Sequence, residues 1–456
     1  MRLRRDLDSG RRRAAGDSRG AAAAKTEEKS VAVLYLENLS GAKEDEYFRD
    51  GITEDIITEL SKIRGLKIYP RPTVLPYRDK PVTPQQVGRE LNAAYVLGGS
   101  LRRAGDRLRI NAQLMDAHTD FTLWSERYDR EMQDVFAVQD EIARKIAEAL
   151  RVTLSPQEQE ALAAKPTQDL QAYDLYLRGR SYARRRTRQD FEFALQLLEH
   201  AVAQDPGFAL GYAAIANVCA QYHCDHEHSP VLIERAIAAV GRAVELQPDL
   251  PETRVAQAWI QLADGKYDLA IAELRRQIER KPDLEGAHYP LCRALFAAGR
   301  YQEVAEMAET AIQAAGEDYN VYVPIQNALG ALGKEETLRN VRQRRILALE
   351  AQLRKVPEDA RARVLIAKSY AETDRTDDAT REMQFALALR PNDANLLYNC
   401  SCLYSRLKMR SEALEVLRKA REAGFRDANW ARRDPDLVFL HGDSEFERLF
   451  PEEAGG

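Results

Sequence analysis

The sequence has little cysteine, no strong excess of one charge and no long hydrophobic run, and each of these features excludes a class of protein. Five cysteines in 456 residues are too few for a disulfide framework, so we expect free thiols packed in helices. The 67 basic residues are balanced by 72 acidic ones, which excludes a protein that coats nucleic acid through overall positive charge. No run of about 18 apolar residues occurs, so no transmembrane helix is predicted.

The amino terminus lacks the apolar centre of a secretory signal peptide, and we therefore expect a cytoplasmic protein. Residues 1–30 hold nine basic and five acidic residues and almost nothing to bury, which predicts a disordered basic tail. Two interpretations of this tail stay open: an arm for nucleic acid or anionic lipid, and a solvated linker, which the scattered charges favour. Residues Gly20 to Thr26 read GAAAAKT, which lacks the second glycine of a P-loop, so no phosphate site is predicted.

The composition of the rest is 45% hydrophobic and 30% charged, which favours a large core under a charge-rich helical surface. Residues 31–155 alternate strand and helix signals in the order β-α-β-α-β-β-β-α, which predicts a small mixed sheet with helices packed against it. The expected elements are a central strand at 31–38, a helix at 46–63, an extended proline-broken edge at 66–77, a helix at 84–93, strands at 94–103, 107–116 and 121–129, and a helix at 134–154.

From residue 167 onward the strand signals vanish and a repeat appears. The helix-ending positions are Pro166, Pro206, Pro248, Pro282, Gly316, Pro357, Pro391 and Phe425, at intervals of 40, 42, 34, 34, 41, 34 and 34 residues. A 34-residue helix-turn-helix period indicates the tetratricopeptide repeat, or TPR. We therefore predict six to seven TPR units over residues 167–425, with insertions between the helices of the three long units and a capping segment at 426–456. The predicted fold class is an α/β domain followed by a right-handed TPR solenoid.

Three segments of residues 31–155 resemble the TolB-like amino-terminal domain of bacterial signalling proteins. They read GITEDIITELSKI, VGRELNAAYVLGGSLRRAGDRLRINAQLMDA and LWSERYDREMQDVFAVQDEI, and AYDLYLRGR at the first repeat extends the similarity. In proteins of that type the pair of domains often follows a class III adenylate or guanylate cyclase, a kinase or a winged-helix domain. The resemblance implies a role in signalling, and because no room is seen here for a catalytic domain, we expect any catalysis to come from another chain.

The motif search favours no enzyme. The sequence has no G-x-S-x-G, no H-E-x-x-H, no dinucleotide-binding fingerprint and no kinase motif. One group of carboxylates precedes or begins the first predicted helix, where the helix dipole stabilises acids without any catalytic role. These residues are Glu44, Asp45, Glu46, Asp50, Glu54 and Asp55. We predict neither catalysis nor a cofactor.

One segment, CAQYHCDHEHSP, is dense in metal-ligand side chains. The candidates are Cys219, His223, Cys224, His226 and His228. Cys219 and His223 are four residues apart on a helix and can chelate zinc or copper, but no second Cys/His pair stands at zinc-finger spacing. We favour an exposed polar loop in a repeat insertion, with Cys219 buried.

The predicted function lies in the groove. In TPR proteins one set of helix positions lines the concave surface, and transfer by register selects Asn217, Gln221, Trp259, Tyr289, Arg293, Lys368, Tyr398 and Arg406. Phe296 occupies such a position too, but we expect it to pack sideways. Trp, Tyr and Arg are enriched in binding hot spots, so these residues predict a protein or peptide partner. The cations Arg293, Lys368 and Arg406 suggest that the partner segment is acidic.

The sequence therefore predicts a protein-interaction scaffold or adaptor in bacterial signal transduction. The alternative is the regulatory part of a class III nucleotide cyclase or kinase system whose catalytic domain lies on another chain. A third interpretation is a DNA-associated regulator that acts through the basic tail. Self-association through the ends of the solenoid is also open.

Overall fold

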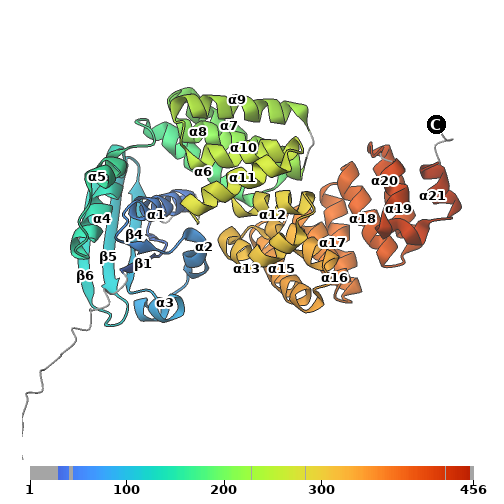
Figure 1. The fold of residues 1–456 in the computed structure, drawn as a ribbon, viewed down its shortest axis with the longest axis horizontal. Coiled ribbons are helices and arrows are strands. Elements are labelled where there is room, and N and C mark those ends of the chain that lie inside the picture. Colours follow the sequence, from blue (N-terminus) through green and yellow to red (C-terminus); the bar gives the residue numbers. More distant parts are fainter. Residues whose placement is uncertain (1–28, 41–44, 227–228, 283, 427, 452–456) are drawn as a thin grey trace, which may run out of the picture.

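The computed structural model describes residues 29–40, 45–226, 229–282, 284–426 and 428–451. Most of the predicted basic tail lies outside these residues. An α/β domain occupies one end of the molecule, and a long helical array extends from it (Figure 1). The predicted fold class, a small mixed sheet followed by a TPR helical array, is confirmed. No helix in the described part of the chain is long and apolar enough to cross a membrane.

The sheet has a parallel half and an antiparallel half. Its strands are β1 (Ser30–Val33), β2 (Glu37–Asn38), β3 (Lys67–Ile68), β4 (Tyr95–Ala104), β5 (Arg107–Asp116) and β6 (Thr122–Glu131). Their order is β3-β1-β4-β5-β6, and β2 also pairs with β4. The strand β1 lies parallel to both neighbours and is fully buried, as the apolar run predicted, whereas β4, β5 and β6 form an antiparallel meander. The strand β6 therefore forms one edge of the sheet.

Glycine is required where β4 passes close to β5. The φ angle of Gly99 is 154°, and a Cβ atom there would lie 1.9 Å from the carbonyl oxygen of Asn111. Any side chain at this position would push the two strands apart.

Helices pack on the sheet and connect its strands. They are α1 (Glu46–Ser61), α2 (Arg71–Val74), η2 (Leu75–Tyr77), α3 (Pro84–Leu91), η3 (Met132–Asp134), α4 (Val135–Ala149) and α5 (Pro156–Ala163). The predicted extended edge at 66–77 is wrong from Arg71 onward, where α2 begins. Pro72 and Pro76 lie in the first turns of α2 and η2. The backbone N–H groups of a first turn have no partner within the helix, so proline, which lacks this group, costs no hydrogen bond there.

The array consists of seven antiparallel helix pairs in the described residues. They are α6 (Leu170–Arg185) with α7 (Arg188–Gln204), α8 (Ala209–Asp225) with α9 (Pro230–Leu246), α10 (Pro251–Ala263) with α11 (Tyr267–Arg280), α12 (His288–Ala297) with α13 (Tyr301–Ala315), α14 (Tyr322–Ala331) with α15 (Glu335–Lys355), α16 (Ala360–Ala371) with α17 (Thr376–Leu389), and α18 (Ala394–Arg406) with α19 (Arg410–Glu422). The second helix of each pair ends within three residues of a predicted helix-ending position.

The expected insertions between helices are wrong, because the extra residues lengthen the helices themselves. In the two long amino-terminal units, α6, α7, α8 and α9 have 16 or 17 residues, against 13 and 14 in α10 and α11. In the third long unit the extra length lies in α15, which has 21 residues.

A carboxy-terminal segment covers the last helix pair. It contains α20 (Ala428–Arg433), η5 (Pro435–Leu440) and α21 (Ser444–Leu449), and η5 packs on α18. Leu437, Phe446 and Phe450 of this segment are buried. The segment occupies the position at which the sequence predicted a cap, since the apolar face of the last repeat needs a cover.

The α/β domain and the first repeats share one hydrophobic core. Phe136 of α4 packs edge to face on Tyr173 of α6, with ring centroids 4.6 Å apart. Gly51 of α1 lies so close to Leu177 of α6 that a Cβ atom would be 2.7 Å from the leucine methyl carbons. Buried residues from Val31 to Val341 form one continuous cluster, and a second cluster extends from Tyr319 to Phe450. The junction between the two domains is therefore a packed interface.

Candidate functional site

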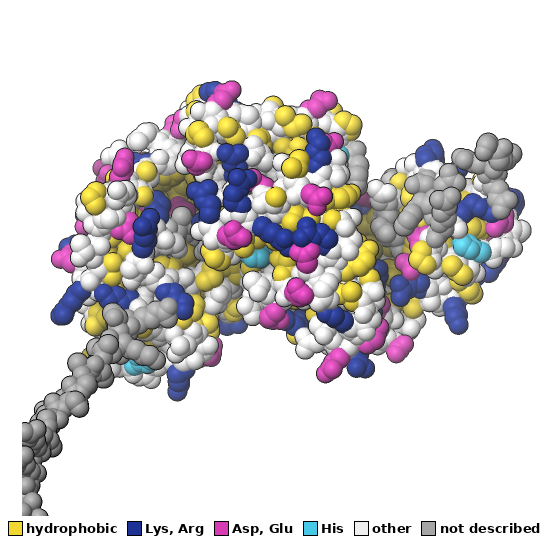
Figure 2. Space-filling view, viewed as in Figure 1, with side chains coloured by type: hydrophobic (Ala, Val, Ile, Leu, Met, Phe, Trp, Pro, Cys, Tyr) yellow, Lys and Arg dark blue, Asp and Glu magenta, His cyan; other side chains and the backbone are white. Residues whose placement is uncertain are grey.

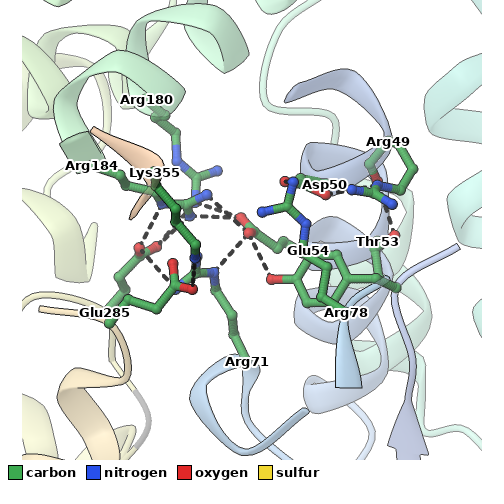
Figure 3. A network of polar contacts seen from close by, with 12 residues as sticks. Arg49, Asp50, Thr53, Glu54, Arg71, Arg78, Arg180, Arg184, Glu285 and Lys355 are labelled. Carbon is green, nitrogen blue, oxygen red and sulfur yellow. Dashed lines mark hydrogen bonds and ion pairs between the residues drawn. The ribbon is translucent and has the colours of Figure 1, made fainter. Parts of the chain in front are cut away.

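A cluster of charged residues around one buried carboxylate lies where the α/β domain meets the array. We call it the Glu54 cluster, and its members are Glu54 of α1, Arg71 of α2, Arg180 and Arg184 of α6, and Glu285 between α11 and α12. These residues come from four separate segments and point toward one another (Figure 3).

Glu54 is the centre of the cluster. Its side chain is 6% exposed and is contacted by all three arginines: Oε2 lies 2.6 Å from Nη2 of Arg184, and Oε1 lies 2.7 Å from Nε of Arg71. Arg180 completes the set at 3.3 Å. The Tyr35 hydroxyl also donates to Oε1, at 3.2 Å. Both oxygens of this buried carboxylate thus face donors, as a buried charge requires.

Both carboxylates of the cluster stay ionised at neutral pH. Burial by itself raises the pKa of Glu54, but the charges of Arg184, Arg71 and Arg180 outweigh it and lower the pKa to about 2. Glu285 accepts hydrogen bonds from Arg184, and although burial acts to raise its pKa, the three arginines hold it well below the ordinary value. Three guanidinium groups therefore face two carboxylates, which leaves one positive charge in the cluster.

Asp55, the neighbour of Glu54, behaves in the opposite way. It accepts hydrogen bonds from Gln139 of α4, at 3.2 Å, and from the Tyr173 hydroxyl of α6. Burial raises the pKa of Asp55 to about 7, since the positive charge of Arg180 offsets the effect of burial only in part and the charge of Glu54 adds to it. The residue titrates near neutral pH but does not line the cleft described below, so it does not form an acid/base pair with Glu54.

A cleft opens beside the Glu54 cluster, between α1, α2 and η2 on one side and α6 and α15 on the other. Its volume is about 1040 Å³. The charged residues that line it are Arg71, Arg78, Lys80, Arg178, Arg180, Arg184, Arg185 and Lys355, against Asp45, Glu46, Asp50, Glu54, Asp79 and Glu317. We call this the interdomain cleft. Eight cations against six carboxylates give its wall a small positive excess.

Four of the cations that line the cleft are exposed, namely Lys80, Arg178, Arg185 and Lys355. The side chains of Arg178, Arg185 and Lys355 are 45%, 40% and 52% exposed, whereas those of the cluster arginines are 18% to 27% exposed. Basic and acidic side chains are mixed over the molecular surface, with several Lys and Arg side chains near the middle of the face in Figure 2. The cleft thus combines a fixed, paired interior with long, exposed cations at its mouth.

The predicted groove residues of the third and fourth helix pairs contact their own chain. Tyr289 and Arg293 of α12 both donate to Oδ1 of Asp225 of α8, at 3.1 and 2.6 Å. Arg361 of α16 donates to the backbone carbonyl of Asp225 at 2.9 Å. Trp259 is 1% exposed and packs edge to face on Tyr289. The expected open surface at Trp259 and Tyr289 is therefore wrong, because the array folds back on itself around Asp225.

Predicted groove residues of the last helix pair also contact their own chain. Tyr398 of α18 is buried, stacks on Phe425 with ring centroids 4.1 Å apart, and donates to Asp434 at 2.7 Å. Arg406 pairs with Asp436 at 3.2 Å. The carboxy-terminal segment thus covers Tyr398, and the expectation that this residue is open to a partner is wrong, whereas Arg406 stays 39% exposed.

The other predicted residues are partly exposed. Asn217 donates to the carbonyl oxygens of Ala213 and Glu252 and so ties α8 to α10. Gln221 and Lys368 have intermediate exposure, and their role in binding stays a prediction. Phe296, expected to pack sideways, lies 5.2 Å from the Tyr301 ring.

The segment rich in metal ligands is helical, so the expected exposed loop is wrong for residues 219–225. Cys219 is fully buried, and burial raises the pKa of the Cys224 thiol to about 12. His223 contacts the carbonyl of Ser229 at 3.0 Å, and His226 contacts that of Arg186 at 2.9 Å. Among the described residues no group of three His, Cys, Asp or Glu side chains is placed to hold a metal ion. His228 lies outside them.

The role of Glu54 is not apparent from the sequence. The charge pattern places it with the acids of the helix start, but α1 begins at Glu46 and Glu54 lies in its middle, too far from the first turn for the dipole to explain it. The sequence feature that could have indicated this cluster is the pair Arg180 and Arg184, four residues apart on the first helix of the array. This spacing places two cations on one face of the helix.

Comparison with known proteins adds three findings. Residues 27–145 match the family described as the second domain of HilA/YgeH-like transcriptional regulators. The expected TolB-like domain is not shown by this match and stays a prediction. A protein named "Putative adenylate cyclase 3" from Rhizobium meliloti (strain 1021) is 38% identical over 241 residues, which cover 52% of this chain and 41% of that protein. The chain thus spans about two fifths of the length of this relative.

Solved structures similar to the chain are TPR proteins. A thermophilic TPR protein from Thermus thermophilus is 22% identical with a TM-score of 0.35, covering 42% of this chain and 99% of that one. YrrB, described as a TPR protein with an unusual peptide-binding site, is 20% identical with a TM-score of 0.31, covering 44% and 96%. The Cut9–Hcn1 heterotetramer of the APC/C is 16% identical with a TM-score of 0.42, covering 70% and 53%.

Proposed function

We propose that the chain is a protein-binding scaffold of bacterial signal transduction that acts in the cytoplasm and holds a segment of its partner in the interdomain cleft. The observation that carries this proposal is the position of the cleft. It lies between two domains that a common core and the Glu54 cluster hold in a fixed arrangement. A preformed site of this kind loses little conformational entropy on binding.

The size and charge of the cleft favour a peptide segment over a small molecule. Ligand pockets have volumes of about 300–1,000 Å³ and mostly apolar walls. This cleft, at about 1040 Å³, is lined by fourteen charged residues. Its excess of cations favours an acidic segment, which satisfies them by charge-assisted hydrogen bonds. The acidic partner was expected at Arg293, Lys368 and Arg406, and the present proposal places it at Arg178, Arg185 and Lys355 instead.

Charge reversal at the mouth of the cleft tests this function. The test variant carries Arg178→Glu, Arg185→Glu and Lys355→Glu. The matched control carries Arg242→Glu, Arg381→Glu and Lys419→Glu, three side chains 46%, 56% and 52% exposed on the second helices of their pairs. Each of the six cations has at least one acidic neighbour.

Both variants and the unchanged chain are used to capture proteins from native lysate, and the bound proteins are identified by mass spectrometry. We expect at least one protein that the unchanged chain and the control retain and that the cleft variant loses. Equal capture by all three would refute binding in the cleft. Binding of a synthetic peptide from the captured protein then measures the affinity directly.

A second candidate is the regulatory part of a class III nucleotide cyclase system. The 38% identity to part of the Rhizobium meliloti relative favours it. In that case the purified chain forms no cyclic AMP from ATP and Mn²⁺, but it changes the rate of a cyclase domain supplied on a separate chain. A cyclase rate that is the same with and without the chain would reject this candidate.

A further inference from the structure

The outer edge of β6 is unpaired in the part of the chain that the structure describes. The strand has ten residues, and its only strand partner is β5. It lies on the side of the α/β domain away from the helical array (Figure 1). A long open edge exposes a row of backbone N–H and C=O groups that favours pairing with another strand. Leu123, at the beginning of this edge, is 47% exposed.

The hydrogen-bond pattern with β5 fixes which backbone groups of β6 point outward. The N–H of Met132 donates to the carbonyl of Asp106 at 2.8 Å, in register with the antiparallel ladder. Because bonded pairs alternate along such a ladder, the even-numbered residues of this stretch bond to β5. Ser125, Arg127, Asp129 and Glu131 therefore direct their N–H and C=O groups away from the sheet.

The charges of β6 are antisymmetric about Tyr128. Glu126 and Arg127 precede Tyr128, and Asp129 and Arg130 follow it, so residues at equal distance from Tyr128 carry opposite charges. When two copies of the strand meet in antiparallel orientation with Tyr128 opposite Tyr128, Arg127 faces Asp129 and Glu126 faces Arg130. Each pair occurs twice, so every charge in this stretch meets one of opposite sign across the interface.

Neighbouring symmetric registers lack this property. Centring the pair on Glu126, Arg127, Asp129 or Arg130 places two like charges directly opposite each other, which is destabilising. The Tyr128 register also agrees with the backbone, because it joins Arg127 and Asp129, whose N–H and C=O groups point outward. The hydrogen-bond phase thus permits the Tyr128 register, and the charge pattern selects it among the registers centred on residues 126–130.

We propose that the chain forms a two-fold symmetric homodimer in which the β6 strands of two copies pair antiparallel about Tyr128 and join their sheets into one. The occupant of the open edge is a second copy of this chain, since the edge is complementary to itself. Such an interface is isologous and closed, so it gives dimers and no longer polymers. The proposal is independent of the partner-binding function proposed for the cleft.

Charge reversal with complementation tests this register. In a dimer of the Glu126→Arg variant, the introduced arginine would face Arg130 twice. In a dimer of the Arg130→Glu variant, the introduced glutamate would face Glu126 twice. A mixed dimer of the two variants places the arginines of one copy opposite the glutamates of the other at both positions, so it regains both pairs. The Arg242→Glu variant, changed on α9 far from the sheet edge, is the control.

Sedimentation equilibrium of the full chain is measured over a concentration series from nanomolar to high micromolar. We expect a dimer for the unchanged chain and the control, a dissociation constant raised at least about tenfold in each single variant, and recovery in the equimolar mixture. Circular dichroism checks that the variants stay folded. An unchanged chain that is monomeric throughout, a dimer that neither variant weakens, or a mixture no tighter than its components would each overturn the proposal.

Discussion

Glu54 of α1 and Arg184 of α6 form a bidentate ion pair across the domain junction, with Nη1 donating to Oε1 at 2.9 Å and Nη2 to Oε2 at 2.6 Å. The two residues are 130 positions apart in sequence. Planar, bidentate pairs of this kind fix orientation as well as distance. The pair therefore helps to set the angle at which the α/β domain meets the array.

Replacing Glu54 by glutamine should destabilise the junction. The change leaves Arg71, Arg180 and Arg184 with one carboxylate fewer in a mostly buried setting, and breaking a buried pair costs about 3–5 kcal/mol. We expect a lower midpoint of urea unfolding, measured by tryptophan fluorescence. Glu234→Gln, an exposed change on α9, is the control and should have no effect. An equal midpoint for both variants would contradict the role of the Glu54 cluster.

Glu54 should also make the free energy of unfolding depend on pH in the acid range. The folded pKa of Glu54 is about 2, below the ordinary 4.5. A carboxyl with a lowered folded pKa contributes stability above its unfolded pKa and loses this contribution as the pH falls through the folded value. Thermal melts of the unchanged chain should therefore show falling stability from about pH 5 to pH 2. In Glu54→Gln this fall should be smaller.

Asp55 should have the opposite dependence. Its folded pKa of about 7 lies above the ordinary 3.8, so the folded state holds a proton that the unfolded state has released. Its effect is to lower stability as the pH rises from about 4 to 7. Asp55→Asn keeps the neutral form at all pH values and should raise the melting temperature at pH 8 but hardly at pH 4. A difference from the unchanged chain that is equal at both pH values would argue against the raised pKa.

Asp225 should determine how tightly the array closes. Its side chain is 2% exposed and pairs with Arg293, and Arg186 lies 3.6 Å away. Asp225→Ala removes the carboxylate that these guanidinium groups face and should cost about 3–5 kcal/mol. We also expect a larger radius of gyration in small-angle X-ray scattering. Asp268→Ala, in which a 92% exposed carboxylate is removed, should change neither quantity.

Tyr398 should hold the carboxy-terminal segment on the last repeat. Tyr398→Phe keeps the stacking on Phe425 but removes the hydrogen bond to Asp434 and leaves a buried carboxylate without this donor, at a cost of about 1–3 kcal/mol. We expect faster hydrogen exchange in η5 and α18. Asn399→Ala, at an exposed position of the same helix, is the matched control. Unchanged exchange in η5 would show that the apolar contacts alone hold the segment.

Local structure followed from the sequence to a large extent. The alternation of Leu108 and Ile110 with Arg107 and Arg109 predicted a half-buried strand, and β5 has this pattern. The helix-ending prolines predicted the limits of the array helices. The prediction failed at Pro72 and Pro76, because proline occurs both at strand ends and in the first turn of helices. The residue type alone therefore does not distinguish the two structures.

The candidate site depended on tertiary structure. The sequence by itself determined the α/β domain, the repeat period and the packing of the free cysteines in helices, because hydrophobic spacing within one helix or strand decides these features. Only the fold decided that Asp225 closes the concave face from within and that Glu54 meets three arginines. Each of these contacts joins segments far apart in sequence, and their geometry depends on the curvature that seven packed helix pairs accumulate together.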